Sequence, residues 1–348
     1  MAAGAVILVV YGILILLMIT SYIRVLWHAI FDPGFVGQQP GRKSGSEGTW
    51  QRPGPWQTPR MVRPSPPLES FYDQDFFVCD AQGKPIWCSE CQIWKPDRAR
   101  HSKEFGRCIR RFDHYCPWVG GIVAERNFKF FIQFCTYAAL FSLVSLLVVA
   151  YFLSREVEYR WERTVHLSVT AGLAVFFMLL AGGTALSGWL LAAMNLTTLD
   201  NIHQKTNVWQ VAVSTEMAKR SEGCAFPTVT APKDCKRVFA ILQSPAGCNP
   251  FDAGLMENLR QVLGRHWWHW LLPLRNSPLC YSDTGNSDKP HPSFACIEEI
   301  KEAAGLGSMA PQTRSACDRL RRRQRRFPQL LAGAGAPLKT VKVRSAGG

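Results

Sequence analysis

Hydrophobic residues gather into three long stretches that are separated by polar segments. The first, residues 1–30, has no charged residue before Arg24 and consists mostly of Val, Ile, Leu, Met and Ala. The second and third, residues 130–153 and 165–195, contain no Asp, Glu, Lys or Arg. Each is long enough for a helix to cross about 30 Å of hydrocarbon. The pattern predicts an α-helical multi-pass membrane protein with three spans.

The first hydrophobic stretch could be a membrane anchor or a cleaved signal peptide. A signal peptide has a basic start before its apolar run and small residues at a cleavage site after it. Here the first charge, Arg24, and an aromatic residue, Trp27, follow the apolar run. This order favours an anchor.

The distribution of charge predicts which side of the membrane each segment occupies. The chain has 40 Lys and Arg against 26 Asp and Glu, and the segments before residue 130 and after residue 195 are strongly basic. In residues 154–164 three Arg and three Glu cancel. Because cytosolic segments carry excess Lys and Arg, the long segments are expected in the cytosol. The pattern does not distinguish an endomembrane from the plasma membrane, and without a recognisable binding module no nucleic-acid partner is expected.

Two polar segments lack the hydrophobic periodicity of folded elements. Residues 31–70 include a run, 37–67, with 12 Pro or Gly in 31 positions, which predicts a flexible linker. Residues 276–348 are predicted to be a basic, disordered tail, in which positions 319–326 hold six Arg. This Arg run is either solvated or lies on anionic cytoplasmic lipid at about 1 kcal/mol per charge. Because the spans hold the tail near the bilayer, the sequence favours contact of the Arg run with lipid.

A short aromatic segment precedes the tail. Residues 267–272 read Trp-Trp-His-Trp-Leu-Leu, which is too short and too interrupted to span a bilayer. Such a segment suits either the membrane surface or a packed helix. The residues alone leave both possibilities open.

Candidate metal ligands cluster in residues 79–128. Cys88 and Cys91 are followed by His101 and Cys108, the inventory of a tetrahedral structural zinc site. The alternative is a set of reduced thiols packed in a small core, but residues 95–100 are too polar to supply one. Metal ligation is the better source of folding energy for so small a unit. We therefore expect a small cytosolic cysteine-rich domain stabilised by one structural Zn²⁺.

A further cysteine, Cys116, lies outside this ligand set. It is preceded by Asp113 and His114 and followed by Pro117 and Trp118. A histidine can take the proton of a thiol, and a carboxylate can orient and stabilise the resulting imidazolium. A His two residues from a Cys could also be a zinc pair, but four other ligands are already accounted for. Asp113, His114 and Cys116 are therefore candidate catalytic residues.

These motifs resemble the cysteine-rich domain of the DHHC protein S-acyltransferases, especially the fungal branch that reads Asp-His-Tyr-Cys. Three further elements support the resemblance. Asp32-Pro33-Gly34 looks like the family's DPG element, and within residues 196–275 Thr197-Thr198-Leu199-Asp200 and Asn249-Pro250-Phe251-Asp252 through Asn258 look like its TTxE and carboxy-terminal motifs.

The resemblance implies a protein S-palmitoyltransferase. In such an enzyme the Cys116 thiolate attacks the thioester of a long-chain acyl-CoA such as palmitoyl-CoA. A thiol of a membrane-associated protein then takes the acyl group at the cytosolic face. By the same resemblance Trp118 is expected to line the entrance for the acyl chain, although a plain packing role is equally compatible with the sequence.

The chain also departs from the family's pattern. Ligands of a second zinc site would fall at Ser102, Phe105, Tyr115 and Ile122, none of which is Cys or His. We expect the last three to form an apolar cluster that replaces the metal. Asp200 stands where the TTxE element has Glu, so its contact with the zinc domain is expected to be altered. Three spans replace the usual four, which means either that the chain dispenses with the first helix or that its start codon is misassigned.

Other classes of protein fit the residues less well. A catalytically inactive membrane zinc-domain scaffold is the main alternative, but it would not need Asp113, His114 and Cys116. A RING-type ubiquitin ligase would need eight ligands, and only four are available. A transporter would be expected to carry ionisable residues inside its spans.

Overall fold

The computed structural model describes most of the chain up to residue 280. The described residues are 2–37, 65–74, 76–155, 161–203, 208–214, 228–230, 238–244 and 247–280. Most of the predicted linker within residues 31–70, and the basic tail from residue 281 onward with its Arg run, therefore lie outside the described residues.

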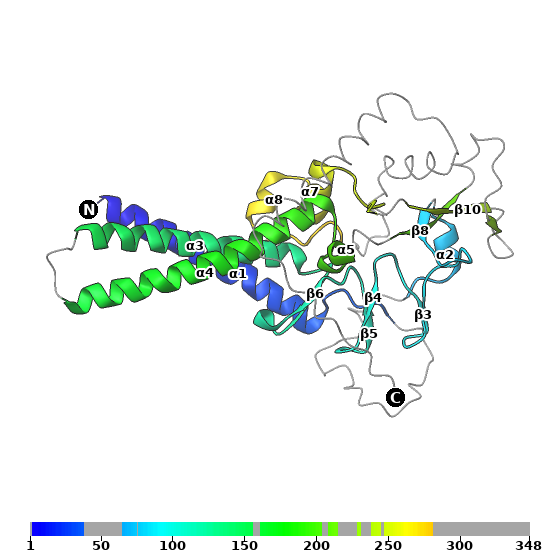
Figure 1. Ribbon diagram of the computed structural model, residues 1–348, viewed down its shortest axis with the longest axis horizontal. Coiled ribbons are helices and arrows are strands. Elements are labelled where there is room, and N and C mark those ends of the chain that lie inside the picture. The colour runs from blue at the N-terminus through cyan, green and yellow to red at the C-terminus, as the bar shows by residue number, and fades with distance from the viewer. Residues whose placement is uncertain are drawn as a thin grey trace, which may run out of the picture. The chain divides into compact units, whose positions relative to one another are not determined.

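Three long helices form the membrane-spanning part of the described chain. They are α1 (Ala2–Phe31), α3 (Phe128–Arg155) and α4 (Trp161–Met194). Among the described residues, these three helices contain segments long and apolar enough to cross a membrane. Helix α3 packs against both α1 and α4 (Figure 1). The predicted fold class, a helical multi-pass membrane protein with three spans, is confirmed.

Small residues allow close packing at two points, one on α3 and one in the segment just before it. A Cβ atom at Gly188 of α4 would lie 2.9 Å from the Ile132 side chain of α3, which is closer than such atoms approach. A Cβ atom at Gly121 would lie 3.0 Å from Cβ of Ala29, near the end of α1. Small residues let helix backbones approach where lipid supplies no hydrophobic driving force. These contacts hold α4 against α3 and the segment before α3 against α1.

Three short antiparallel hairpins build the cysteine-rich domain. They are β2 (Trp87–Cys88) with β3 (Ile93–Trp94), β4 (Arg100–Ser102) with β5 (Arg107–Ile109), and β6 (His114–Cys116) with β7 (Gly121–Val123). A 3₁₀ turn, η2 (Pro117–Val119), joins β6 to β7, and Gly120 follows it with a left-handed φ of 61°. The chain passes from β7 into α3 within a few residues. The last hairpin is thereby fixed to the end of a span.

The DPG element joins α1 to this domain. One carboxylate oxygen of Asp32 accepts hydrogen bonds from the backbone N–H groups of Gly34 and Phe35, both at 2.8 Å. The other oxygen lies 2.8 Å from the Arg126 guanidinium. The backbone N–H of Val36 donates to the carbonyl oxygen of Cys108 at 2.8 Å. The segment that follows the first span is therefore hydrogen-bonded directly to β5.

A four-stranded antiparallel sheet was not predicted from the sequence. Its order is β1 (Phe76–Val78), β8 (Gln210–Ser214), β10 (Val238–Gln243) and β9 (Thr228–Thr230). Buried apolar side chains pack on both faces, including Val211 and Val213 on one and Ala212 on the other. Strand β1 comes from before the zinc-ligand segment and the other strands from after α4. The sheet therefore ties the segment before α3 to the segment after α4.

The remaining described helices are short. They are α2 (Glu69–Tyr72), α5 (Thr198–His203), α7 (Leu255–Leu263) and α8 (Trp267–Leu271). Helix α5 directly follows the end of α4, and α7 packs against α4 and α3. Both help to position the residues that surround the candidate site.

Candidate active site and metal centre

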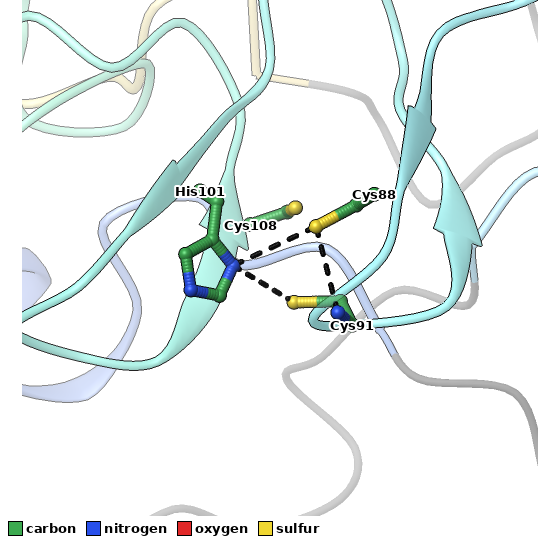
Figure 2. Close-up of side chains that lie close together, drawn as sticks. All are labelled: Cys88, Cys91, His101 and Cys108. Atoms are coloured by element: carbon green, nitrogen blue, oxygen red, sulfur yellow. Dashed lines mark hydrogen bonds between the residues drawn. The ribbon is translucent and has the colours of Figure 1, made fainter.

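The four predicted metal ligands converge on one point (Figure 2). The side chains of Cys88, Cys91, His101 and Cys108 place their ligand atoms within 4.8 Å of one another. Nδ1 of His101 lies 3.2 Å from Sγ of Cys91 and 3.7 Å from Sγ of Cys88. Among the residues that the structure describes, this is the one such group of three or more His, Cys, Asp or Glu.

The geometry of this cluster fits a tetrahedral zinc ion. Bonds of about 2.3 Å to sulfur and about 2.0 Å to nitrogen place neighbouring ligand atoms about 3.5–3.8 Å apart. The nitrogen–sulfur separation expected from these bonds is about 3.5 Å, and the two separations from His101, 3.2 and 3.7 Å, lie on either side of it. Register explains the convergence, because His101 and Cys108 are directly paired across β4 and β5. The backbone N–H of Cys91 also donates to Sγ of Cys88 at 3.4 Å, which favours a thiolate.

The positions of a second zinc site hold a different arrangement. Phe105 and Ile122 pack in an apolar cluster, as predicted, together with Phe35, Ile109, Phe112 and Ala124. Tyr115 is 49% exposed and is absent from that cluster, so the prediction is wrong for this residue. A phenol placed among hydrocarbon side chains would need a hydrogen-bond partner, whereas its hydroxyl is satisfied in water. Ser102 donates a 2.6 Å hydrogen bond to Glu104 instead of binding an ion.

The candidate catalytic residues lie together on β6 and at the position before it. Nδ1 of His114 lies 2.6 Å from a carboxylate oxygen of Asp113. The imidazole also interacts with the Cys116 thiol, because alternate residues of the strand face the same side. Asp113 and Cys116 are buried, while His114 is about a third exposed. These three residues, which are neighbours in the sequence, therefore connect a carboxylate, an imidazole and a thiol.

This arrangement favours an ion pair between thiolate and imidazolium. Burial opposes the charge on His114, but hydrogen bonds to Asp113 and Cys116 overcome it and raise the pKa of His114 to about 9. Burial likewise opposes ionisation of Cys116. Hydrogen bonds from His114 and from the backbone N–H groups of Val119 and Trp118 outweigh it and lower the pKa of the thiol. Both shifts favour a nucleophilic sulfur at neutral pH.

Comparison with known proteins places the chain in a family. Residues 81–205 match the family model described as DHHC palmitoyltransferase. The chain is 33% identical to Palmitoyltransferase pfa5 of Aspergillus fumigatus over 358 residues, covering 87% of this chain and 80% of the relative. It is 32% identical to Palmitoyltransferase pfa5 of Emericella nidulans, covering 88% and 78%, and 26% identical to Palmitoyltransferase PFA5 of Saccharomyces cerevisiae, covering 61% and 56%.

The chain belongs to the DHHC palmitoyltransferase family. The resemblance seen in the sequence is thereby confirmed, as are the predictions of a membrane-integral protein and of an acyltransferase. No observation favours the catalytically inactive scaffold. Asp113, His114 and Cys116 and the Cys and His cluster that could hold a metal ion all lie within the matched residues 81–205.

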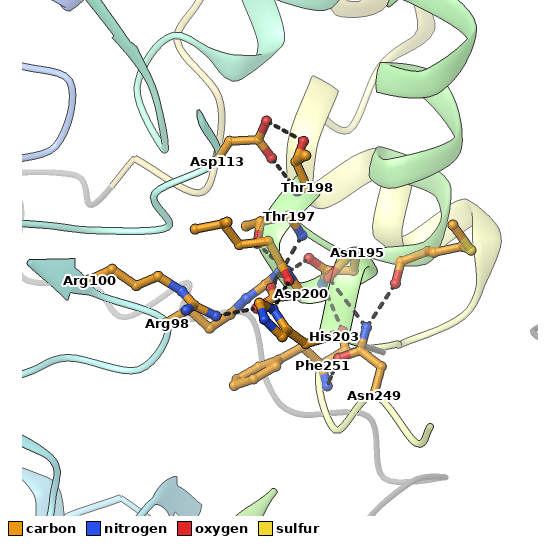
Figure 3. Close-up of polar contacts among 12 residues, drawn as sticks. Arg98, Arg100, Asp113, Asn195, Thr197, Thr198, Asp200, His203, Asn249 and Phe251 are labelled. Atoms are coloured by element: carbon orange, nitrogen blue, oxygen red, sulfur yellow. Dashed lines mark hydrogen bonds and ion pairs between the residues drawn. The ribbon is translucent and has the colours of Figure 1, made fainter. Parts of the chain in front are cut away.

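The TTxE-like element of this DHHC protein, residues 197–200, holds the carboxylate of Asp113 in place (Figure 3). Thr198 donates from its backbone N–H to one oxygen of Asp113 and from its hydroxyl to the other, each at 2.8 Å. Together with the contact to His114, these bonds fix the carboxylate in one orientation. The sequence identified the element by resemblance only. Nothing in its spacing revealed that Thr198 contacts Asp113, 85 residues away.

The shorter side chain of Asp200 still reaches the zinc-ligand segment. One oxygen lies 2.7 Å from the Arg98 guanidinium and the other lies 3.3 Å from that of Arg100 (Figure 3). Burial disfavours the charge on Asp200, but Arg98, by its charge and its hydrogen bond, holds the pKa of the carboxyl at about 2. The substitution of Glu by Asp therefore leaves an ion pair between the TTxE element and this segment in place.

The carboxy-terminal motif caps the end of α4. The Asn249 side chain donates to the carbonyl oxygens of Met194 and Asn195 at 2.8 and 3.3 Å, and that of Asn258 donates to Ala193 at 2.8 Å. Asn195 in turn accepts a 3.0 Å hydrogen bond from Arg98. The last carbonyl groups of a helix have no partner within it, so these amides satisfy them. The end of the third span is thus joined to the same network as Asp200.

Proposed function

We propose that Cys116 is the nucleophile of this protein S-palmitoyltransferase, with His114 as its base and Asp113 as the group that orients the base. The observation that carries the assignment is the continuous set of contacts from Thr198 through Asp113 and His114 to Cys116. A zinc site or a structural hairpin would not need a buried carboxylate held by three donors. In an activated thiol such a carboxylate has a role, because it orients the base.

The proposed reaction has two transfers. The Cys116 thiolate attacks the thioester carbon of a long-chain acyl-CoA, such as palmitoyl-CoA, and the bond from that carbon to the CoA sulfur breaks. The imidazolium of His114 gives its proton to the departing CoA thiolate. A cysteine thiol of a membrane-associated protein then loses its proton to His114 and attacks the acyl group, which regenerates the Cys116 thiolate.

The position of Cys116 suits substrates that meet at a membrane surface. Its partner in the hairpin is Gly121, which touches Ala29 near the end of α1, and α3 begins at Phe128. The acyl chain is soluble in the bilayer, whereas CoA and target thiols are not. By the positive-inside pattern we place this end on the cytosolic face. Trp118, 70% exposed beside the nucleophile, is proposed to line the acyl entrance.

One structural Zn²⁺ per chain is proposed, held by Cys88, Cys91, His101 and Cys108. When bound, the ion supplies folding energy by joining the first two hairpins. The hairpin β4–β5 is also joined to the first span without the ion, because the backbone N–H of Val36, just after the DPG element, donates to the carbonyl oxygen of Cys108. Anionic lipid is further proposed as a partner of the Arg run in residues 319–326, which lies outside the described residues.

The test of this function is acyl labelling in cells. Intact protein is labelled with an alkyne fatty acid, and the total hydroxylamine-labile label on the chain is measured by mass spectrometry. Cys116→Ala is expected to lose it. Cys79→Ala is the matched control, because burial, with the charges of Asp80 and Asp97, raises the pKa of that thiol to about 12. Equal labelling of intact protein and Cys116→Ala would refute the assignment. No labelling of intact, zinc-loaded protein would favour the scaffold.

A further inference from the structure

The aromatic segment near the end of the described chain combines the two possibilities that its sequence left open. We define the tryptophan segment as residues 267–274, which comprise α8 and the turn after it. Helix α8 has no buried residue. The large apolar side chains that the segment exposes are Trp267, Trp268, Leu271, Leu272 and Leu274. Yet the segment is firmly attached to the spanning helices through its backbone.

The first set of attachments comes from one face of α3. The Gln133 side chain donates to the carbonyl oxygens of His269 and Trp270 at 3.3 and 2.9 Å. One turn further along, the Tyr137 hydroxyl donates to the carbonyl oxygen of Leu271. One turn earlier, the buried Lys129 ammonium donates to the backbone carbonyl oxygen of Arg275 at 3.0 Å. Residues four apart share a helix face, so these three donors form a single row along α3.

A second attachment comes from α1. The Arg24 guanidinium donates to the carbonyl oxygen of Leu274 at 3.1 Å and to the side chain of Asn276 at 2.8 Å. The third tryptophan of the segment, Trp270, turns toward the protein, where its indole N–H donates to the carbonyl oxygen of Gly264 at 2.7 Å. The backbone and one indole are therefore committed to the protein, while the other aromatic rings face outward.

The row of donors sets the depth of the segment. Gln133 and Tyr137 lie inside the spanning stretch Phe128–Ser154, roughly 8 and 14 Å along the helix from its start at about 1.5 Å per residue. These positions lie in the half of the span that is nearer the cysteine-rich domain, where backbone carbonyls that leave water must find partners in the protein. The hydrogen bonds to α3 and α1 meet that requirement. A segment lying over this part of α3 faces the bilayer.

We propose that the exposed face of the tryptophan segment inserts into the lipid interface of the membrane that holds the spans. Tryptophan is enriched at the boundary between headgroups and acyl chains. The segment is bracketed by Arg265 and Arg275, both exposed, which can meet anionic headgroups. Arg24 of α1 bonds to this segment, and Ile23 and Trp27 on either side of it are also exposed apolar side chains. This surface is independent of the chemistry at Cys116.

Fluorescence quenching by brominated lipids tests the proposal. The full chain is reconstituted into phosphatidylcholine nanodiscs with bromines near the headgroup end or the tail end of the acyl chains. The emission of Trp267 and Trp268 is obtained as the difference between intact protein and Trp267→Phe/Trp268→Phe. Shallow bromines are expected to lower this difference at least about twofold, and deep bromines less, as interfacial rings require. The matched control is Trp87→Phe, whose difference emission comes from an exposed ring on the zinc-binding hairpin and is expected to be insensitive.

Two results would overturn the proposal. If aqueous iodide, and not brominated lipid, quenches the difference emission, the rings lie in water. If neither quencher acts and the nanodisc holds two chains, a second copy covers the surface. Zinc content reports the fold of each variant, and Trp268→Phe alone repeats the measurement if the double variant loses zinc.

Discussion

Replacing Asp113 by Asn should disable the thiolate–imidazolium pair while nearly preserving shape. The pKa of His114 is raised from 6.5 to about 9, and hydrogen bonding to Asp113 is the largest contribution that raises it. With a pKa of about 9, roughly 97% of His114 is protonated at pH 7.5, against roughly 10% at its ordinary pKa. If loss of the Asp113 charge returned the pKa of His114 to its ordinary value, the population of the pair at pH 7.5 would fall about tenfold. Loss of orientation adds to this, so autoacylation should slow by about 10² or more.

The assay measures the pH dependence of alkylation at Cys116 itself. Purified protein reacts with iodoacetamide between pH 6 and 10, and mass spectrometry follows the peptide that contains Cys116. Intact protein should react at neutral pH, because the thiol pKa is lowered. In Asp113→Asn the reaction should require a higher pH, near the ordinary range of a cysteine, about 8.5. Asp80→Asn is the control, since this carboxylate accepts hydrogen bonds from the backbone N–H groups of Gln82 and Lys84 within its own turn.

An unchanged pH profile and autoacylation rate in Asp113→Asn would refute this reasoning. It would show that the thiolate arises without His114 being held by the carboxylate. The zinc content of the variant must match that of intact protein, because a lost fold would also slow the reaction. Rates measured as single turnovers separate acylation of Cys116 from transfer to a second protein.

Three further predictions follow from the same contacts. Elemental analysis should return one zinc ion per chain, and Cys91→Ser should lose both metal and fold. Tyr115→His should add no second ion, since one imidazole cannot hold zinc without partner ligands. Two ions per chain, or one ion that survives the Cys91 change, would contradict the ligand assignment. Thr198→Val should slow autoacylation about tenfold, because a hydrogen bond to a charged group contributes about 1.5–3 kcal/mol. Thr198→Ser should keep most of the rate. Equal rates for the two variants would show that the hydroxyl is not needed. Asp200→Asn should destabilise the fold by about 3–5 kcal/mol, seen as a lower Tm, because it leaves the Arg98 charge buried without its partner. Because the pKa of Asp200 is lowered from 3.8 to about 2, the stability that its charge contributes is fully present above pH 3.8 and is lost as the pH falls through about 2. The Tm of intact protein should therefore fall over that window more than the Tm of Asp200→Asn.

The sequence by itself determined the features that depend on local pattern. Three spans follow from runs of apolar residues, because crossing a bilayer requires length and hydrophobicity wherever the helix packs. The zinc-ligand set follows from spacing, because two short hairpins bring Cys88, Cys91, His101 and Cys108 together within 21 positions. His114 and Cys116 share a face because side chains alternate along a strand. Each inference needs only residues that are close in the chain.

Tertiary structure decided the contacts that join distant segments. Thr198 meets Asp113 across 85 residues and Asp200 meets Arg98 across 102, and no periodicity specifies either pair. The four-stranded sheet was missed for a related reason, since strands buried on both faces lose the alternation that marks a strand. Likewise, the donors on α3 that hold the tryptophan segment acquire their role only when residues 269–275 return to that helix. Such contacts depend on where the chain folds back on itself, which is a property of the whole fold.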